Sequence, residues 1–118
     1  LTAPGSRIEG IGRPRAEPSF VRTLADRMVE VADVDSVAAM RVLSQLLGRR
    51  VGPSTGTNFV AMLTLAHEMR ERGESGSILS LLCDAGERYL PTYYNCDWVH
   101  QTMGDCASAE QRLNALLA

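Results

Sequence analysis

The segment GPSTG, residues 52–56, places a serine between two glycines with the spacing GxSxG. In one class of hydrolases this spacing forms a sharp turn between a strand and a helix, and the turn exposes a nucleophilic serine. Asp84, Asp97 and His100 follow Ser54 in the chain order that those enzymes use for their acid and base. The motif therefore allows a serine hydrolase with Ser54 as its nucleophile.

The same turn has two other interpretations. A serine or threonine hydroxyl at the start of a helix often accepts hydrogen bonds from the free backbone amides of the first turn. Alternatively, glycines on both sides let a flat ring approach the backbone, and the hydroxyl can then hydrogen-bond a ring nitrogen without protonating it. The residues of the turn leave all three interpretations open.

Other residue groups match known sites less well. Residues 10–12 read GIG, but Arg15 stands where a dinucleotide-binding fingerprint needs its third glycine, and no strand precedes the motif. His67 lies in a predicted helix, yet Glu71 occupies the position of the second histidine in the helical zinc motif. A last group near the end of the chain has a spacing that matches no common metal site: Cys96, Asp97, His100 and Cys106. We expect no metal.

The composition excludes several classes of function. The chain has 118 residues, of which 45% are hydrophobic and 22% charged, and its formal net charge is −2. All 12 basic residues are arginines, so these residues supply no lysine nucleophile, Schiff-base lysine or Walker lysine. The near-neutral charge gives no general attraction to nucleic acid or to an anionic membrane surface. A small acidic metabolite could still bind locally.

The apolar stretches and the cysteines indicate the cellular compartment in which we expect the protein. The longest apolar stretches, residues 59–66 and 78–83, are far shorter than the roughly 20 residues that cross a bilayer. The three cysteines, Cys83, Cys96 and Cys106, form no CxxC pair and leave one thiol over in any disulfide scheme. We therefore expect a reducing compartment, the cytoplasm. Because residue 1 is leucine, we expect the chain to begin inside a longer translation product.

Apolar spacing predicts two amphipathic helices. The first runs through Leu47, with capping side chains among residues 33–36 and a stop at Gly48. The second follows the GPSTG turn and ends near Gly73. Within it, Glu68 and Arg72 have the i,i+4 spacing of a favourable ion pair.

Two other stretches have the length and composition of strands. Residues 27–31, RMVEV, can form a short strand, and residues 77–83, SILSLLC, form the continuous apolar run expected of a parallel strand covered on both faces. Helices that alternate with buried strands indicate an α/β architecture. Two or three strands leave open edges, so we expect this sheet to be incomplete within the chain.

Three stretches, taken in order, resemble one protein family: RIEGIGRPR, RRVGPSTGTN and LLCDAGERYLPTYYN. That family shows GIG, then a turn of the type GxSxG or GISSGA, then a strand that closes in SGERYLST. The chain therefore resembles the C-terminal part of the cysteine synthase and cystathionine β-synthase family of pyridoxal-phosphate enzymes, fold type II. Within the family it is most similar to the bacterial cysteine desulfhydrase branch, from about Gly5 to Trp98.

The resemblance implies cofactor-binding roles for four residues. Ser54 would hydrogen-bond the pyridine nitrogen of pyridoxal 5'-phosphate, which suits β-elimination and β-replacement because the leaving group departs readily. Gly10 and Gly12 would form a loop whose backbone lies against cofactor and substrate. Asp84 would follow a strand end and lie on the ring-nitrogen side.

Two arginines after the GIG motif depart from the family pattern, because many cysteine synthases have small residues there. We hypothesise that Arg13 or Arg15 holds the carboxylate of a substrate or partner, since a guanidinium binds a carboxylate through two parallel hydrogen bonds. The alternative is that both pair with structural acids such as Glu9 or Glu17.

The resemblance also implies that several functional residues of the family are absent from this chain. The family's Schiff-base lysine, the asparagine that faces the ring oxygen and the phosphate-binding loop lie in N-terminal regions that the 118 residues do not contain. We therefore expect no catalytic residue in this chain and predict that it is inactive alone. The missing N-terminal part of its own enzyme would be its partner.

The implied fold is part of a three-layer αβα domain like that of the tryptophan synthase β subunit, with a parallel-rich sheet. Residues 1–20 would form a loop bordering the active site, 21–100 a core of strands and helices, and 101–118 a C-terminal helix. The implied activity is elimination of L-cysteine to pyruvate, ammonia and hydrogen sulfide by a homodimer. Cysteine synthesis by β-replacement, a hydrolase using Ser54 and a non-catalytic binding module remain alternatives.

Overall fold

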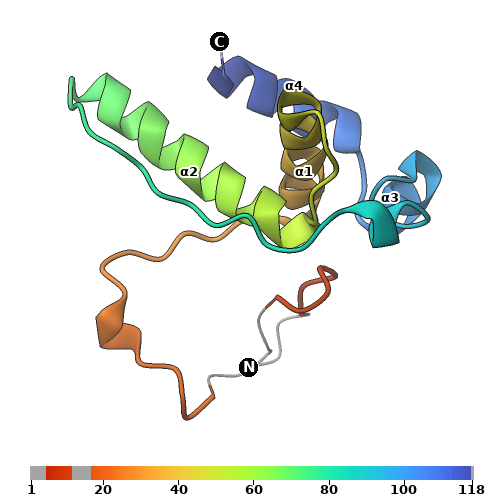
Figure 1. The fold of residues 1–118 in the computed structure, drawn as a ribbon, viewed down its shortest axis with the longest axis horizontal. Helices are drawn as coiled ribbons and strands as arrows, with labels where there is room; N and C mark the ends of the chain where they lie inside the picture. The colour runs from red at the N-terminus through yellow and green to blue at the C-terminus, as the bar shows by residue number, and fades with distance from the viewer. Residues whose placement is uncertain (1–4, 12–16, 118) are drawn as a thin grey trace.

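A computed structural model of the chain describes residues 5–11 and 17–117. Within these ranges lie four α-helices: α1 (Asp33–Leu47), α2 (Pro53–Glu71), α3 (Cys96–Thr102) and α4 (Cys106–Leu117). Two short 3-10 helices, η1 (Arg22–Leu24) and η2 (Glu87–Tyr89), precede α1 and α3. Helix α1 packs against both α2 and α4, and residues 17–32 form an arm that extends away from the helices (Figure 1). None of the described helices combines the length and apolar character needed to cross a membrane.

Helix α1 confirms the helix predicted from apolar spacing. It ends at Leu47, and Gly48 then adopts a left-handed conformation with φ +68° while its amide bonds to the Ser44 carbonyl. Glycine takes this conformation without the steric penalty of a side chain, so it stops the helix. The predicted capping by side chains is wrong, because Ala32 is the N-cap and no side chain bonds to the free amides there.

Helix α2 begins inside the GPSTG segment rather than after it. Gly52 is the N-cap, without a side-chain hydrogen bond, and Pro53 is the first helical residue. Proline suits that position because its missing N–H would have no partner within the helix and its φ is already helical. The interpretation of Ser54 as a helix cap is therefore wrong, and the hydroxyl is free for another role.

The two long helices approach most closely at Gly56. A methyl group on Gly56 would lie 2.0 Å from the Ser36 carbonyl oxygen and 2.8 Å from the Met40 amide nitrogen, so only glycine fits between the backbones. Beside this crossing, the hydroxyls of Ser36 and Thr57 share a hydrogen bond of 2.6 Å. The crossing fixes the direction of α2, whose first turn carries the candidate site.

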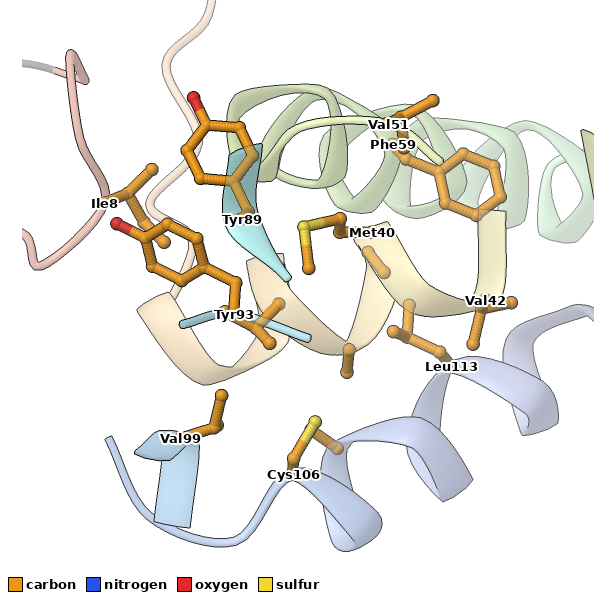
Figure 2. Packing of buried hydrophobic residues seen from close by; sticks show 14 of the residues in the cluster. Ile8, Met40, Val42, Val51, Phe59, Tyr89, Tyr93, Val99, Cys106 and Leu113 are labelled. Carbon is orange, nitrogen blue, oxygen red and sulfur yellow. The ribbon is translucent and has the colours of Figure 1, made fainter. Parts of the chain in front are cut away.

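One hydrophobic cluster joins the helices to the loops around them. Met40 of α1 is fully buried, and Figure 2 shows it between Phe59 of α2 and the two rings of Tyr89 and Tyr93. From the other side, Cys106 and Leu113 reach from α4 toward α1 (Figure 2). The rings of Tyr89 and Tyr93 extend the hydrophobic cluster from α1 to the N-terminal loop.

The two predicted strands are extended, but they are not paired in a sheet. Within the described ranges the only β pairing is an isolated antiparallel bridge between Val51 and Ala85. A strand needs a neighbouring backbone as partner, and residues 27–31 and 77–83 find none among the described residues. The predicted sheet is thus absent from this part of the chain. Leu79 shows the consequence, because it is 96% exposed.

Side chains of α2 hold these extended segments instead. Arg27 donates two hydrogen bonds, of 2.5 and 2.8 Å, to the Glu68 carboxylate. Asn58 Nδ2 donates to the Leu81 carbonyl at 3.2 Å. The predicted direct contact between Glu68 and Arg72 is not formed, and Arg72 Nη1 lies 3.9 Å from Glu74 Oε1 instead, although the charge of Arg72 still helps Arg27 to lower the pKa of the Glu68 carboxyl. Because the planar guanidinium of Arg27 forms two parallel hydrogen bonds with the Glu68 carboxylate, Glu68 binds Arg27 rather than an arginine of its own helix.

Candidate functional site

A pocket of about 340 Å³ lies where the N-terminal loop, the start of α2 and the residues after the second extended segment meet. It contains three of the residues to which the sequence assigned cofactor binding, Gly10, Ser54 and Asp84. The other residues that line it are Glu9, Cys83, Arg88 and Tyr89. Segments that are far apart in the chain therefore converge on one site.

Ser54 presents an unused hydroxyl to this pocket. It is the second residue of α2 and is half-buried. Among the described residues none forms a hydrogen bond with its Oγ, whereas the neighbouring Thr55 is buried and bonded. A polar ligand that accepts a hydrogen bond at the start of α2 would find this donor available.

Two hydrogen bonds fix the end of the second extended segment on the first turn of α2. The Cys83 amide donates to Thr55 Oγ1 at 2.8 Å, and the Gly52 amide donates to the Asp84 carbonyl at 3.0 Å. They bring Asp84 to the same pocket as Ser54. The position of the extended segment, and hence of the Asp84 side chain, therefore depends on the start of the helix.

The Asp84 carboxylate is held by Tyr89. The Tyr89 hydroxyl donates a short hydrogen bond to Asp84 Oδ2. The ring is 5% exposed, and burial, followed by the hydrogen bond to Asp84, raises the pKa of Tyr89 to about 12. A methyl group on Gly52 would lie 2.0 Å from Asp84 Oδ1, so this oxygen sits directly against the Gly52 backbone.

Sequence reasoning did not single out Tyr89. The only signal was its place in the GERY stretch, five residues after Asp84. Its partner is an acid whose position depends on contacts with α2, so the pair could not be read from spacing. Arg88 lies over the Tyr89 ring, with its guanidinium carbon 5.1 Å from the ring centroid.

Tyr93 holds the N-terminal loop against the site. Its hydroxyl donates to the Arg7 carbonyl at 2.9 Å and accepts a bond from the Glu9 amide at 3.1 Å. Glu9 also pairs with Arg88 across the pocket at 3.2 Å. Gly10 follows with φ +72°, a conformation that glycine adopts readily.

The first residue of α1 provides the second anchor of this loop. Asp33 accepts hydrogen bonds from the Ser6 hydroxyl and from the Arg7 amide, both at 2.6 Å. Its carboxylate therefore faces the loop rather than the free amides of its own helix. Tyr94, which follows Tyr93, instead donates to the Val51 carbonyl at 2.8 Å and shares a bond of 2.6 Å with Ser44.

Some of the predicted site residues are not brought to the pocket. Asp97 and His100 lie in α3 and do not line it, and His67 does not line it either. Ser54 thus has no histidine beside it to act as a general base, which removes the geometric basis for the hydrolase interpretation. Gly12, Arg13 and Arg15 lie outside the described residues.

The cysteine and acid cluster near the chain end is built around one arginine. Arg41 Nη1 donates to Cys96 Sγ at 3.3 Å and lies 3.7 Å from Glu110 Oε1. Cys106 Sγ donates to the same Glu110 oxygen at 3.6 Å. In the described part of the chain, no group of three or more His, Cys, Asp or Glu side chains is placed to hold a metal ion.

Comparison with known proteins finds relatives that are named as an L-cysteine desulfhydrase and as cysteine synthases. The chain is 57% identical over 94 residues to an L-cysteine desulfhydrase of Mycobacterium tuberculosis, a match that covers 80% of this chain and 26% of that protein. It is 33% identical over 96 residues to cysteine synthase 2 of Schizosaccharomyces pombe, covering 80% of this chain and 24% of the relative. The chain belongs to the family of cysteine synthases and cysteine desulfhydrases, as its motifs predicted.

A third relative carries the name of a cofactor. A Caenorhabditis elegans protein whose name includes the words "pyridoxal-phosphate dependent" is 35% identical over 88 residues, covering 71% of this chain and 20% of the relative. The chain thus spans about a quarter of the length of these curated relatives. No protein-family profile matches the chain, and no solved structure matches it.

Proposed function

We propose that the protein to which this chain contributes is a pyridoxal-phosphate-dependent lyase that eliminates sulfide from L-cysteine, giving pyruvate and ammonia. The relative with 57% identity is named an L-cysteine desulfhydrase, and this similarity favours elimination. Cysteine synthesis by β-replacement is the second candidate, because relatives from Schizosaccharomyces pombe and Aquifex aeolicus are named cysteine synthases. The structural observation that carries the proposal is the unpaired Ser54 hydroxyl in the pocket beside Gly10 and Asp84.

The described residues fit a pyridine ring at this pocket. The ring nitrogen needs a donor that does not itself ionise, and Ser54 Oγ has no competing partner among the described residues. No heavy atom lies within 4 Å of the place that a Cβ on Gly10 would take, so the backbone is open to a ligand on this side of the pocket. We propose that Gly12 also lies against the cofactor, as the family resemblance implies. When bound, the cofactor supplies an electron sink for reactions at the carbon next to the substrate amino group.

The proposal also covers substrate binding, for which the candidate residues precede the arm in the chain. We propose that Arg13 or Arg15 holds the substrate carboxylate. Of the two acids considered as their structural partners, Glu9 already pairs with Arg88. Arg13→Met and Arg15→Met, made singly, should weaken substrate affinity for at least one of the two. Unchanged affinity in both variants would contradict the role.

We further propose that the rest of the enzyme, N-terminal to this chain, completes the sheet of a three-layer αβα domain. Residues 77–83 have no backbone partner in a sheet among the described residues, and Leu79 and Leu81 are exposed. Both observations support this proposal, since a strand with such side chains is stable only when covered. The division into a loop over 1–20, a core over 21–100 and a C-terminal helix over 101–118 remains part of this proposal. Amide exchange of residues 77–82 should be slow in the whole enzyme and fast in the 118-residue chain; equally fast exchange in both would contradict it.

The same unpaired segments argue against a self-sufficient binding module, because such a module would have to cover them by itself. We propose that the intact enzyme is a cytoplasmic homodimer, as the family resemblance implies. Free thiols at the exposed Cys83 and Cys96 suit a reducing compartment. Sedimentation of the natively purified enzyme would test the dimer.

The first experiment is reduction of the natively purified protein with borohydride, followed by intact mass measurement under denaturing conditions. Borohydride fixes any Schiff base between a lysine and the cofactor. A species longer than 118 residues that carries a pyridoxyl-phosphate adduct would support the proposal. A lone 12.8 kDa species without an adduct would contradict it for this chain, because the chain contains no lysine.

A further inference from the structure

One wall of the candidate pocket belongs to the N-terminal loop, where Glu9 and Gly10 line the cavity. The Tyr93 hydroxyl holds this wall, because it accepts a hydrogen bond from the Glu9 amide at 3.1 Å and donates to the Arg7 carbonyl at 2.9 Å. A single hydroxyl thus uses its donor and an acceptor on backbone groups on both sides of Ile8. The path of the loop immediately before Gly10 is therefore set by Tyr93.

Tyr93 is itself held in the hydrophobic core. The residue is 2% exposed, and its ring packs against Tyr89 and edge-on against Trp98, each with a centroid distance of 5.3 Å. Ile8 of the loop is 4% exposed and belongs to the same cluster (Figure 2). Tyr93 does not line the pocket, so it can act on a ligand only through the loop.

The two walls of the pocket depend on different hydrogen bonds. The loop has a second anchor in Asp33, which accepts hydrogen bonds from the Ser6 hydroxyl and the Arg7 amide. The wall that carries Ser54 is held instead by the bonds between the first turn of α2 and the second extended segment. Removing the Tyr93 hydroxyl therefore releases the loop and leaves the hydrogen bonds of the Ser54 wall in place.

We propose that Tyr93, with Asp33 as the second anchor, is a positioning residue for the substrate: it places the backbone of Gly10 against the substrate while Ser54 holds the cofactor ring. This inference rests on the proposed function and deepens it. The Glu9 carboxylate is already paired with Arg88, and Gly10 has no side chain, so the loop offers its backbone to a ligand. A small shift of this backbone spoils the fit, because binding depends closely on the position of the contacting groups.

The test uses the whole enzyme with its cofactor and measures three quantities: the affinity for pyridoxal 5'-phosphate, and the KM and kcat of sulfide release from L-cysteine. Tyr93→Phe should raise KM roughly fivefold or more and leave kcat and cofactor affinity within about twofold, because a loss of uniform binding raises KM alone. A merely structural role would reduce the amount of folded enzyme and leave the KM of the remaining molecules unchanged.

Tyr94→Phe is the matched control, because it removes the same group from the neighbouring residue. The Tyr94 hydroxyl also has bonded partners, the Val51 carbonyl at 2.8 Å and the Ser44 hydroxyl at 2.6 Å, but none in the described part of the N-terminal loop. This variant should leave KM within about twofold of the wild-type value. Asp33→Asn weakens the other anchor, since an amide offers one acceptor oxygen where the carboxylate offers two, and it should also raise KM.

The outcomes separate this inference from the proposed function. If the wild-type enzyme binds no pyridoxal 5'-phosphate or releases no sulfide from L-cysteine, both fall. If the wild type is active and Tyr93→Phe changes KM no more than Tyr94→Phe does, the proposed function stands and the role of Tyr93 is overturned. Equal losses of cofactor and substrate affinity in Tyr93→Phe would overturn it as well. Should Tyr93→Phe fail to fold, Asp33→Asn carries the test, and an unchanged KM in that variant overturns the inference.

Discussion

The hydrogen bond from the Cys83 amide to Thr55 Oγ1, 2.8 Å long, ties the end of an extended segment to the first turn of α2. Thr55 is 1% exposed, whereas its neighbour Ser54 is half-buried and its hydroxyl has no partner among the described residues. Two adjacent hydroxyls thus serve different purposes. One maintains the structure of the site, and the other is available to a ligand.

We expect Thr55→Val to lower the free energy of unfolding by about 1–3 kcal/mol, because it removes the acceptor of a part-buried backbone amide while keeping the shape of the side chain. Ser54→Ala is the matched control and should change stability by less than about 0.5 kcal/mol. Urea denaturation followed by circular dichroism measures both. A large loss of stability in Ser54→Ala would contradict the assignment of its hydroxyl to a ligand.

A second prediction concerns the crossing of α1 and α2. Gly56→Ala should lower the free energy of unfolding by about 1–3 kcal/mol or more, because the new methyl group would meet the Ser36 carbonyl at 2.0 Å. Alanine's better helix propensity, worth about 1 kcal/mol, offsets only part of this loss. Gly76→Ala is the control, since its methyl group meets only Met69 Cε at an ordinary 3.5 Å. Equal stability of the two variants in thermal denaturation would show that the helices do not cross at Gly56.

The sequence predicted the long helices because their signals are local. Apolar residues three and four positions apart define α1, and Gly48 ends it, so no distant contact is needed. Side-chain partners were less accessible to prediction. Glu68 has Arg72 at helical spacing, yet it binds Arg27, 41 residues away, through two parallel hydrogen bonds. Which arginine binds the Glu68 carboxylate depends on the folded path of the arm, and local spacing does not reveal that path.

The residues of the candidate site that belong to sequence motifs could be predicted from the sequence. Ser54, Gly10 and Asp84 each follow from a short stretch of sequence, and the structure gathers them in one pocket. Tyr89 was missed because its role depends on where Asp84 lies relative to α2. The sheet could not be judged from local sequence, because strand pairing depends on a neighbouring backbone, and residues 27–31 and 77–83 meet none in the part of the chain that the structure describes.

A third prediction follows from the pKa of Tyr89. Its value is near 10 when unfolded and is raised to about 12 when folded, so the folded state holds the phenol proton more tightly. This contribution to stability is complete below about pH 10 and is lost as the pH rises through about 12. The free energy of unfolding of the wild type should therefore fall over this window by on the order of 2 kcal/mol.

Tyr89→Phe has no phenol to ionise, and its stability should fall less steeply over the same pH window. Denaturation series at about pH 9, 10, 11 and 12, for both proteins, measure the two slopes. Tyr93 also has a raised pKa because of its burial, so some dependence on pH should persist in the variant. Parallel slopes for the two proteins would show that Tyr89 ionises as freely in the folded state as in the unfolded state.

The last prediction distinguishes the three thiols by their reactivity. Cys83 and Cys96 are exposed, whereas Cys106 is buried between α4 and α1 (Figure 2). Burial raises the pKa of Cys106 to about 11, so at pH 8 only roughly one molecule in a thousand carries the thiolate that reacts. Iodoacetamide should modify two thiols rapidly and the third only as α4 opens, and mass spectrometry of peptides should identify the slow thiol as Cys106. Adding denaturant should abolish the difference, because the barrier is burial. Rapid labelling of Cys106 in native buffer would mean that α4 does not stay docked on α1.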